Sequence, residues 1–214
     1  MHYASYVHIG TILLEWVVQT CWMYQILTRT GVVSWDCVCL NTVARLLLLA
    51  TRSVDRLPWW YVGGHWMCSV WPTIVVLLLL KYPSRMAYYL PYYLRWPVLL
   101  AGSAVLSWTV AEFPWSMPWI LFGAYTDVFS SMPQGYIIIK RGGKTDNLTV
   151  GMFFLVFVNR TISGLWYTVE GDEWLDPRVT IYCTYMLIMC FPLVRFYVKR
   201  GRMPNSIHDV YDIV

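Results

Sequence analysis

The stretch Asp127–Asn147, DVFSSMPQGYIIIKRGGKTDN, places an acid inside an apolar segment and a Pro-Gln pair six residues further on. A charged side chain in a membrane interior is costly unless it is paired or hydrated, so Asp127 is a candidate for a functional or ion-paired residue. The chain then becomes basic and glycine-rich, as a loop that follows a membrane span often is. The stretch therefore predicts a membrane helix that carries a charge in its interior.

The composition of the chain indicates a membrane protein built from helices. Of its 214 residues, 58% are hydrophobic and 13% are charged, whereas soluble domains hold about 25% charged residues. Apolar runs of about 20 residues are typical of transmembrane helices, and seven can be drawn: roughly 7–27, 32–50, 59–80, 96–108 extending towards 112, 117–139, 148–168 and 179–198. We therefore expect an all-α membrane protein, with a seven-helix transmembrane bundle over residues 1–198 and a polar C-terminal tail over residues 199–214.

The basic residues predict the orientation of the bundle. With seven spans, alternate loops share a side, and the larger basic set falls on one side: Arg29, Lys81, Arg85, Arg95, Lys140, Arg141, Lys144, Lys199, Arg200 and Arg202. The other side holds Arg52, Arg56 and Arg178. Because Lys and Arg are enriched on the inner side, we expect the C-terminus in the cytoplasm or matrix and the N-terminus outside or in the lumen. The basic residues are spread over several loops, so they do not indicate nucleic-acid binding.

A weak internal repeat is visible in the sequence. YQILTRTG (residues 24–31) matches YIIIKRGG (residues 136–143) at four positions, and each copy is followed by an arginine inside the next span. Arg45 follows Gly31 by 14 residues, and Arg160 follows Gly143 by 17. We therefore expect two parallel three-helix repeats, spans 1–3 and spans 5–7, joined by span 4. Repeats of this kind recur in membrane carriers.

The Pro-Gln pair towards the end of span 5, the basic turn and the arginine in span 6 together resemble the PQ-loop superfamily. Within it, the chain is similar to the ER lumen protein retaining receptors, or KDEL receptors. The likeness covers most of the chain and runs through Phe113, Tyr125, Asp127, Pro133, Gln134, Lys140, Gly142, Arg160, Asp176 and the closing FYVKRGRMP, residues 196–204. The resemblance implies seven helices in two triple-helix bundles, with a polar cavity that binds the acidic C-terminal peptide of escaped ER proteins.

The chain departs from the family at positions that hold the peptide. Leu48 stands where the family has an aspartate in the second span, and Met117 and Ile120 replace a glutamate and a tryptophan in the fifth. Phe191 replaces an acid in the seventh span, and SGLWYTVEG (residues 163–171) replaces a run of polar ligand contacts in the sixth. These departures imply that the scaffold is kept while much of the pocket is lost.

Three charged residues inside the predicted spans are the candidate site: Arg45, Asp127 and Arg160. They bind a ligand, or Asp127 forms a buried ion pair with Arg160 or Arg45 that locks the two bundles. Glu15 and Gln19 share a face of span 1 because they are four residues apart; they line a cavity or, more commonly, hydrogen-bond a neighbouring helix. We interpret Pro133 and Gln134 as a hinge. No catalytic motif, metal site or cofactor site is evident.

Three functions remain open. The first is a non-enzymatic accessory subunit of a larger membrane complex, such as a mitochondrial respiratory-chain complex, with other membrane subunits and the lipid bilayer as partners. The second is a divergent sorting receptor of the ER and Golgi, in which the candidate arginines bind a C-terminal peptide carboxylate. The third is a small-solute transporter of the PQ-loop type, with Pro133 as a bending point.

Overall fold

The computed structural model describes residues 2–28, 33–52, 59–81, 90–110, 116–141, 145, 147–170 and 177–200. Within these ranges the chain forms seven α-helices and one short 3-10 helix, and no strand. The helices are α1 (His2–Thr28), α2 (Trp35–Arg52), α3 (Trp59–Lys81), α4 (Trp96–Val110), α5 (Ser116–Arg141), α6 (Asn147–Glu170) and α7 (Pro177–Arg200), with η2 (Tyr92–Leu94) before α4. The expected all-α class with seven helices is therefore confirmed.

The helices coincide with the seven predicted spans, with shifts at their ends. α1 begins at His2, five residues before the predicted start, and α7 continues through Arg200. The predicted tail at residues 199–214 therefore begins within a helix, and residues 201–214 lie outside the described part of the chain. Pro133 does not end α5, because the helix continues through Arg141. A proline removes one backbone donor from a helix, which permits a bend without terminating it.

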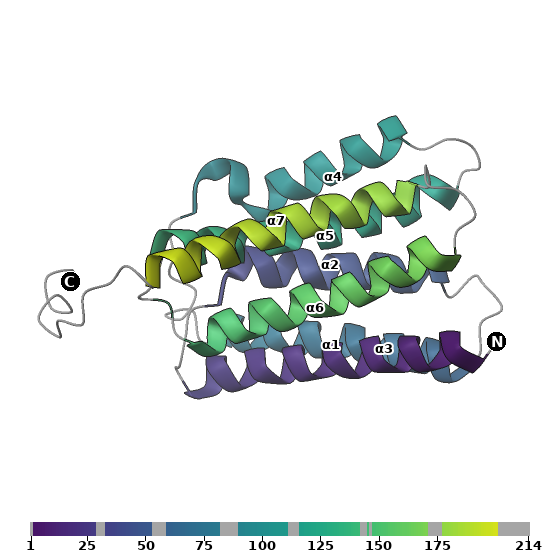
Figure 1. The fold of residues 1–214 in the computed structure, drawn as a ribbon, viewed down its shortest axis with the longest axis horizontal. Coiled ribbons are helices and arrows are strands. Elements are labelled where there is room, and N and C mark those ends of the chain that lie inside the picture. The colour runs from purple at the N-terminus through teal and green to yellow at the C-terminus, as the bar shows by residue number, and fades with distance from the viewer. Residues whose placement is uncertain are drawn as a thin grey trace, which may run out of the picture.

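The helices run side by side along the long axis of the molecule, with the start of α1 and the end of α7 at opposite ends (Figure 1). α2 and α5 make the most extensive contact of any helix pair and lie between the other helices. α2 also packs on α3, and α5 packs on α4 and α7, while α6 packs on α1 and α7 and α1 packs on α3. Asp36 Oδ1 accepts a 2.8 Å hydrogen bond from the backbone N–H of Trp96, which fastens the start of α4 to α2.

Two apolar clusters hold the helices together. One joins α5, α6 and α7 through residues that include Leu121, Ile138, Phe153, Met189 and Phe196. The other joins α1, α2 and α3 and also takes Met152 from α6; its members include Val18, Trp22, Ile26, Val38 and Val75. Each cluster thus belongs mainly to one group of three helices, and α6 links the two.

Glycines on α5 allow neighbouring helices to approach closely. A Cβ atom on Gly123 would lie 3.1 Å from the side chain of Leu48 on α2. A Cβ atom on Gly135 would lie 2.9 Å from the ring of Pro192 on α7 and 3.4 Å from Phe153. Because the Pro192 ring is rigid, it has little room to move away, so the spacing of α5 and α7 depends on the absence of a side chain at residue 135.

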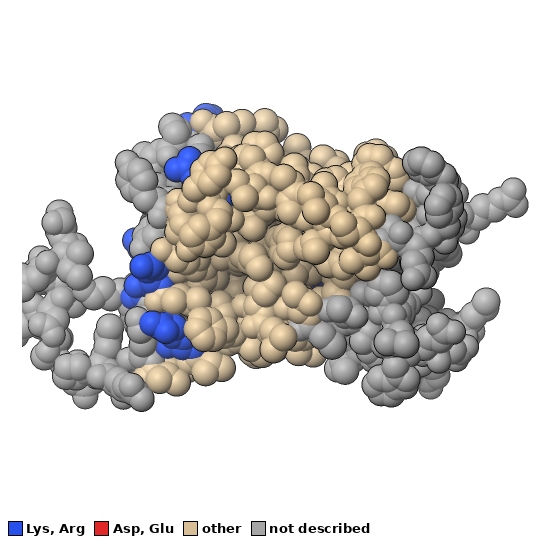
Figure 2. Space-filling model, turned by 90° about the horizontal axis from the view of Figure 1, so that it is seen from above, with Lys and Arg blue, Asp and Glu red and all other residues tan. Residues whose placement is uncertain are grey.

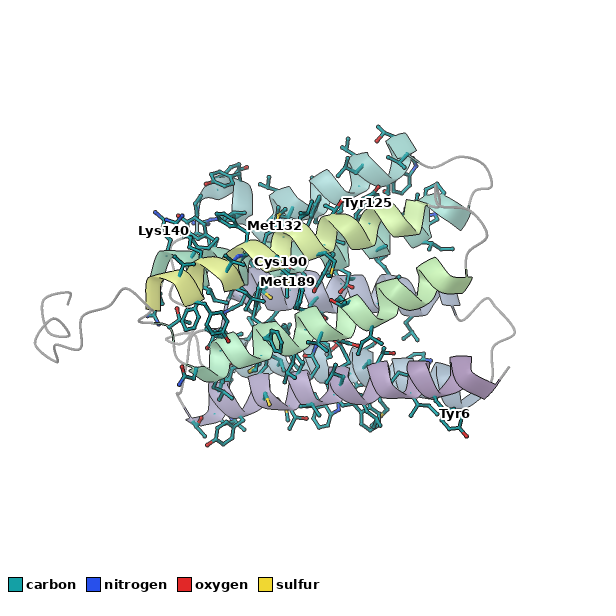
Figure 3. The ribbon with its side chains drawn as sticks, viewed as in Figure 1. Tyr6, Tyr125, Met132, Lys140, Met189 and Cys190 are labelled. Carbon is teal, nitrogen blue, oxygen red and sulfur yellow. The ribbon has the colours of Figure 1, made fainter. Side chains whose placement is uncertain are left out.

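The distribution of polar and apolar side chains is inverted relative to a soluble bundle. α1 exposes Tyr6, Ile9, Leu13, Val17, Tyr24 and Leu27, while it buries Glu15, Gln19 and Gln25. α7 likewise exposes Leu187, Phe191, Val194, Tyr197 and Val198. Tyr6 points away from the bundle near the N-terminal end of α1 (Figure 3). Surfaces of soluble proteins seldom carry such continuous apolar faces.

Among the described residues, none of the helices combines the length and the apolar character needed to cross a membrane.

Exposed basic side chains gather at one end of the bundle. Lys81, Arg95, Lys140, Arg141 and Arg195 are all exposed, and blue side chains appear only at the C-terminal end of the face in Figure 2. That end also holds Lys140 in Figure 3. No acidic side chain is visible among the described residues on the face of Figure 2. The other basic residues used to predict orientation have side chains outside the described set.

Substitution of Gly135 by alanine should destabilise the protein, whereas the same change at Gly151 should not. Alanine favours a helix over glycine by roughly 0.5–1 kcal/mol, and nothing lies within 4 Å of a Cβ atom on Gly151. At Gly135 that gain is outweighed by the contact with Pro192. Thermal denaturation of both variants in detergent should give a lower Tm for Gly135→Ala and an equal or higher Tm for Gly151→Ala. Equal increases at both positions would contradict the close packing of α5 on α7.

Candidate functional site: a buried charge quartet

Four charged side chains from four different helices meet in the middle of the bundle. They are Glu15 of α1, Arg45 of α2, Asp127 of α5 and Arg160 of α6, here called the charge quartet. Arg45 Nη2 lies 2.9 Å from Glu15 Oε2 and 3.6 Å from Asp127 Oδ1. Arg160 Nη2 lies 2.8 Å from Asp127 Oδ1 and 3.8 Å from Glu15 Oε2. Each arginine therefore contacts both acids.

The charge quartet is deeply buried and carries no net charge. Its side chains expose between 5% and 11% of their surface, so all four have lost most of their hydration. An isolated buried ion costs several kcal/mol, and a buried pair is tolerated when opposite charges and hydrogen bonds replace the lost water. Two arginines and two acids achieve this balance within the protein itself.

Two neighbouring side-chain amides donate hydrogen bonds to the carboxylate of Glu15. Gln19 Nε2 donates a 3.1 Å hydrogen bond to Oε1 of Glu15, and Asn159 Nδ2 donates one of the same length to Oε2. On the other side, the guanidinium of Arg160 lies 5.9 Å from the centre of the Tyr185 ring. Within about 6 Å such a contact is a favourable cation–π interaction. The quartet is thus enclosed by polar and aromatic side chains of the bundle.

The structure brings together the three candidate residues expected from the sequence, Arg45, Asp127 and Arg160. Asp127 contacts both arginines, so both of the proposed pairs are present at once. Glu15 is the member that sequence reasoning did not place in the charged set, although it was expected to form interhelical contacts. Glu15 could have been recognised as a member of the charged set because it is a carboxylate in the centre of an otherwise apolar segment.

The Pro133-Gln134 pair lies at a contact between α5 and the start of α2. Gln134 Oε1 accepts a 2.9 Å hydrogen bond from the backbone N–H of Ser34, just before α2 begins. Helix starts leave backbone N–H groups without partners inside the helix, so Gln134 supplies an acceptor there. On the neighbouring interface, Gln25 Nε2 donates a 3.0 Å hydrogen bond to Thr149 Oγ1 near the start of α6. The hinge role assigned to the pair stays a prediction.

Three of the positions at which the sequence was expected to depart from the KDEL receptors, Leu48, Ile120 and Phe191, have described side chains. Leu48 packs against Gly123 at the contact of α2 with α5. Ile120 and Phe191 are exposed on the outer surface, Phe191 by 59%. The side chain of Met117, and those of residues 163–171, lie outside the described set. The described replacements therefore contribute to helix packing or to the outer surface.

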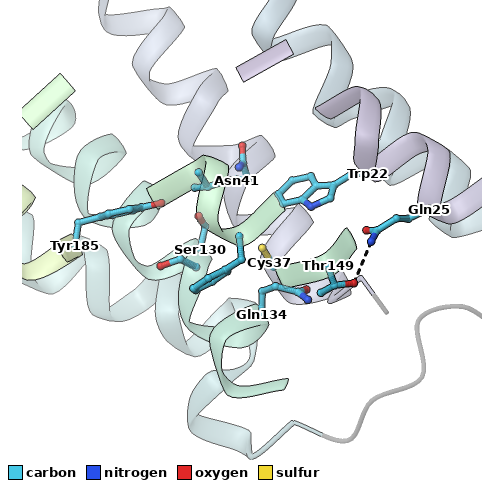
Figure 4. A pocket seen from close by; sticks show the side chains of 11 residues that line it. Trp22, Gln25, Cys37, Asn41, Ser130, Gln134, Thr149 and Tyr185 are labelled. Carbon is cyan, nitrogen blue, oxygen red and sulfur yellow. Dashed lines mark hydrogen bonds between the residues drawn. The ribbon is translucent and has the colours of Figure 1, made fainter. Parts of the chain in front are cut away.

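A small pocket lies between α1, α2, α5, α6 and α7 (Figure 4). Its volume is about 20 Å³, and it is lined by Trp22, Gln25, Cys37, Asn41, Ser130, Ser131, Gln134, Thr149, Phe153, Val156 and Tyr185. A buried water needs at least about 10–15 Å³ measured in this way. Oδ1 of the buried Asn41 has no hydrogen-bond partner among the described protein atoms. The pocket is suited to about one water molecule and is far smaller than a peptide.

No family model matches the chain, and the search of curated proteins also gives no match. Among the described residues, no group of three or more His, Cys, Asp or Glu side chains is arranged to hold a metal ion.

Replacing Asp127 by alanine should destabilise the protein more than replacing Asp36, an acid outside the quartet. Loss of Asp127 leaves a buried arginine without its closest partner, which typically costs about 3–5 kcal/mol. Loss of Asp36 removes an acceptor from the first N–H of α4, which typically costs about 1 kcal/mol.

Thermal and denaturant unfolding of Asp127→Ala and Asp36→Ala in the same detergent would measure this difference. An equal or smaller effect at Asp127 would contradict the structural importance of the quartet.

Proposed function

We propose that the chain is a non-enzymatic membrane protein that serves as a structural or accessory subunit of a larger membrane complex. The proposal rests mainly on the mutual neutralisation of the four charges in the quartet. Its four charges neutralise one another, and the neighbouring pocket has room for about one water. A centre that satisfies its own charges is suited to holding helices together.

The inverted surface supports a location in a lipid bilayer. Apolar faces of α1 and α7 point outward, while Glu15, Gln19, Asn41, Arg45 and Asp127 are buried between helices. Lipid-facing helices follow this pattern because hydrocarbon does not solvate polar groups. The exposed basic residues at one end fit the enrichment of Lys and Arg on the inner side of a membrane. The proposed orientation has the C-terminus in the cytoplasm or matrix.

The helix contacts support two parallel three-helix repeats, α1–α3 and α5–α7, joined by α4. If α1, α2 and α3 are exchanged with α5, α6 and α7, each major contact among these six helices maps onto another major contact among them. The contact of α1 with α3 maps onto that of α5 with α7, and α2 with α3 maps onto α6 with α7. Between the repeats, the contact of α2 with α5 maps onto that of α6 with α1. This agreement extends the short sequence match between residues 24–31 and 136–143.

The departures from the KDEL receptors favour an accessory role over peptide retrieval. Leu48 fills a helix contact where that family has an acid, and Phe191 lies on the outer surface. An outer apolar surface is suited to contact with other membrane subunits as well as with lipid. An organellar energy-converting complex, such as a mitochondrial respiratory-chain complex, is the proposed setting, with the ER or Golgi as the alternative location.

Purification from native membranes tests this proposal. The tagged chain, extracted in a mild detergent, should migrate on a native gel with an assembly much larger than its own mass. Cross-linking and mass spectrometry should identify membrane subunits in contact with it, and alkaline carbonate should leave it in the membrane fraction. A stable monomer without partners would contradict the accessory role, and release by carbonate would contradict the membrane location.

A sorting receptor is the second candidate function. Nε of Arg45 and Nε of Arg160 have no hydrogen-bond partner among the described protein atoms, and arginine binds carboxylates well. Titration with an acidic C-terminal tetrapeptide at two pH values, one near neutral and one mildly acidic, would separate the two functions. We expect no saturable binding at either pH. Binding that is lost in Arg160→Met would favour the receptor.

A further inference from the structure

The charge quartet follows the internal repeat of the sequence residue by residue. Glu15 lies nine residues before Tyr24, and Asp127 lies nine residues before Tyr136, the first residues of the two matching segments. The register therefore makes Glu15 the counterpart of Asp127. Arg45 and Arg160 are also counterparts, except that three more residues separate Arg160 from Gly143 than separate Arg45 from Gly31.

The same displacement of three residues appears at a second pair of positions. Ser34 follows Gly31 by three residues, and Thr149 follows Gly143 by six. The backbone N–H of Ser34 donates a hydrogen bond to Gln134 across the contact of α2 with α5, and Thr149 Oγ1 accepts one from Gln25 across the contact of α6 with α1. The two glutamines differ by about one helical turn in register. Both interfaces between the repeats thus carry a glutamine bond near the basic end and an ion pair near the middle.

The distances within the quartet obey the same symmetry. Within each repeat, the acid and the arginine lie 2.9 Å apart for Glu15 and Arg45, and 2.8 Å apart for Asp127 and Arg160. Between the repeats, the separations are 3.6 Å for Arg45 and Asp127 and 3.8 Å for Arg160 and Glu15. Coulomb attraction falls with the inverse of distance, so each pair between repeats keeps about three quarters of the attraction found within a repeat.

We infer that the charge quartet is a symmetric latch between the two repeats, in which Glu15 and Asp127 have equivalent roles. Each arginine is held by the acid of its own repeat and shared with the acid of the other. This inference rests on the two-repeat architecture of the proposed function. It adds that neither ion pair is independent, because removal of one charge leaves one opposite charge in excess, which interacts with the charges of both repeats.

A double-mutant cycle between repeats tests the latch. Glu15→Gln and Arg160→Met should each lower the Tm, because each leaves the quartet with a net charge. The double variant keeps Arg45 and Asp127, which remain 3.6 Å apart in the present geometry. The decrease in Tm of the double variant should therefore be smaller than the sum of the decreases in the two single variants. If the charges attracted one another only within a repeat, the double variant would hold two unpaired charges, and its decrease in Tm would equal or exceed the sum of the single decreases. That result would overturn the inference.

A second double-mutant cycle, on the symmetry-related pair of residues, is the matched comparison for the first. Asp127→Asn with Arg45→Met should show a similar shortfall from additivity, because it leaves Glu15 and Arg160. Asp36→Asn with Arg160→Met is the control and should be additive, since Asp36 belongs to the contact with α4. A shortfall in only one of the two cycles between repeats would overturn the equivalence of Glu15 and Asp127.

Conservative variants keep the test possible if an arginine replacement prevents folding. Glu15→Asp and Asp127→Glu each change the length of one acid, and the double variant exchanges the two acids between equivalent positions. The double variant should have a Tm above that expected from the sum of the single shifts. Additive shifts would count against the latch. A chain that passes these tests but purifies without partners would retain the latch and lose the accessory function, so the two failures can be distinguished.

Discussion

The rest of the structure depends on the requirement that four charges buried away from water neutralise one another. Glu15, Arg45, Asp127 and Arg160 come from four helices, so their mutual neutralisation fixes the relative positions of α1, α2, α5 and α6. Loss of one partner leaves an uncompensated charge where solvent cannot reach it, and this penalty exceeds the net worth of a typical surface ion pair several-fold. The ion pairs contribute more to the choice of one arrangement than to overall stability, since van der Waals packing between the helices involves many more atoms than the ion pairs do.

Close packing of the helices around the quartet lets its four side chains contact one another. Gly123 lets α5 approach α2 closely, which is consistent with the 3.6 Å separation of Asp127 from Arg45. The two apolar clusters pack the helices that carry the quartet against α3 and α7. The charged side chains lie inside and the outer faces of α1 and α7 are apolar, a distribution that suits a helical protein in a bilayer.

Much of the fold could be predicted from the sequence because apolar runs of this length have few alternatives. The seven helices and the meeting of Arg45, Asp127 and Arg160 follow from the hydrophobic pattern and from the cost of an unpaired buried charge. The place of Glu15 in the quartet was harder to predict, since a single acid has several possible interhelical partners. The register of the short repeat pairs Glu15 with Asp127, but four identical positions in an eight-residue stretch of apolar sequence are weak evidence by themselves. The outward position of Phe191 and the small pocket depend on side-chain packing, which no local pattern specifies.

The most direct measurement of the central claim is an experimental structure of the chain within its native assembly, at a resolution that shows side chains. The account predicts that the four quartet side chains contact one another, that the neighbouring pocket holds no more than ordered water, and that another membrane subunit packs on the outer apolar surface. Density for a ligand between Arg45 and Arg160, with the two acids separated from them, would contradict it.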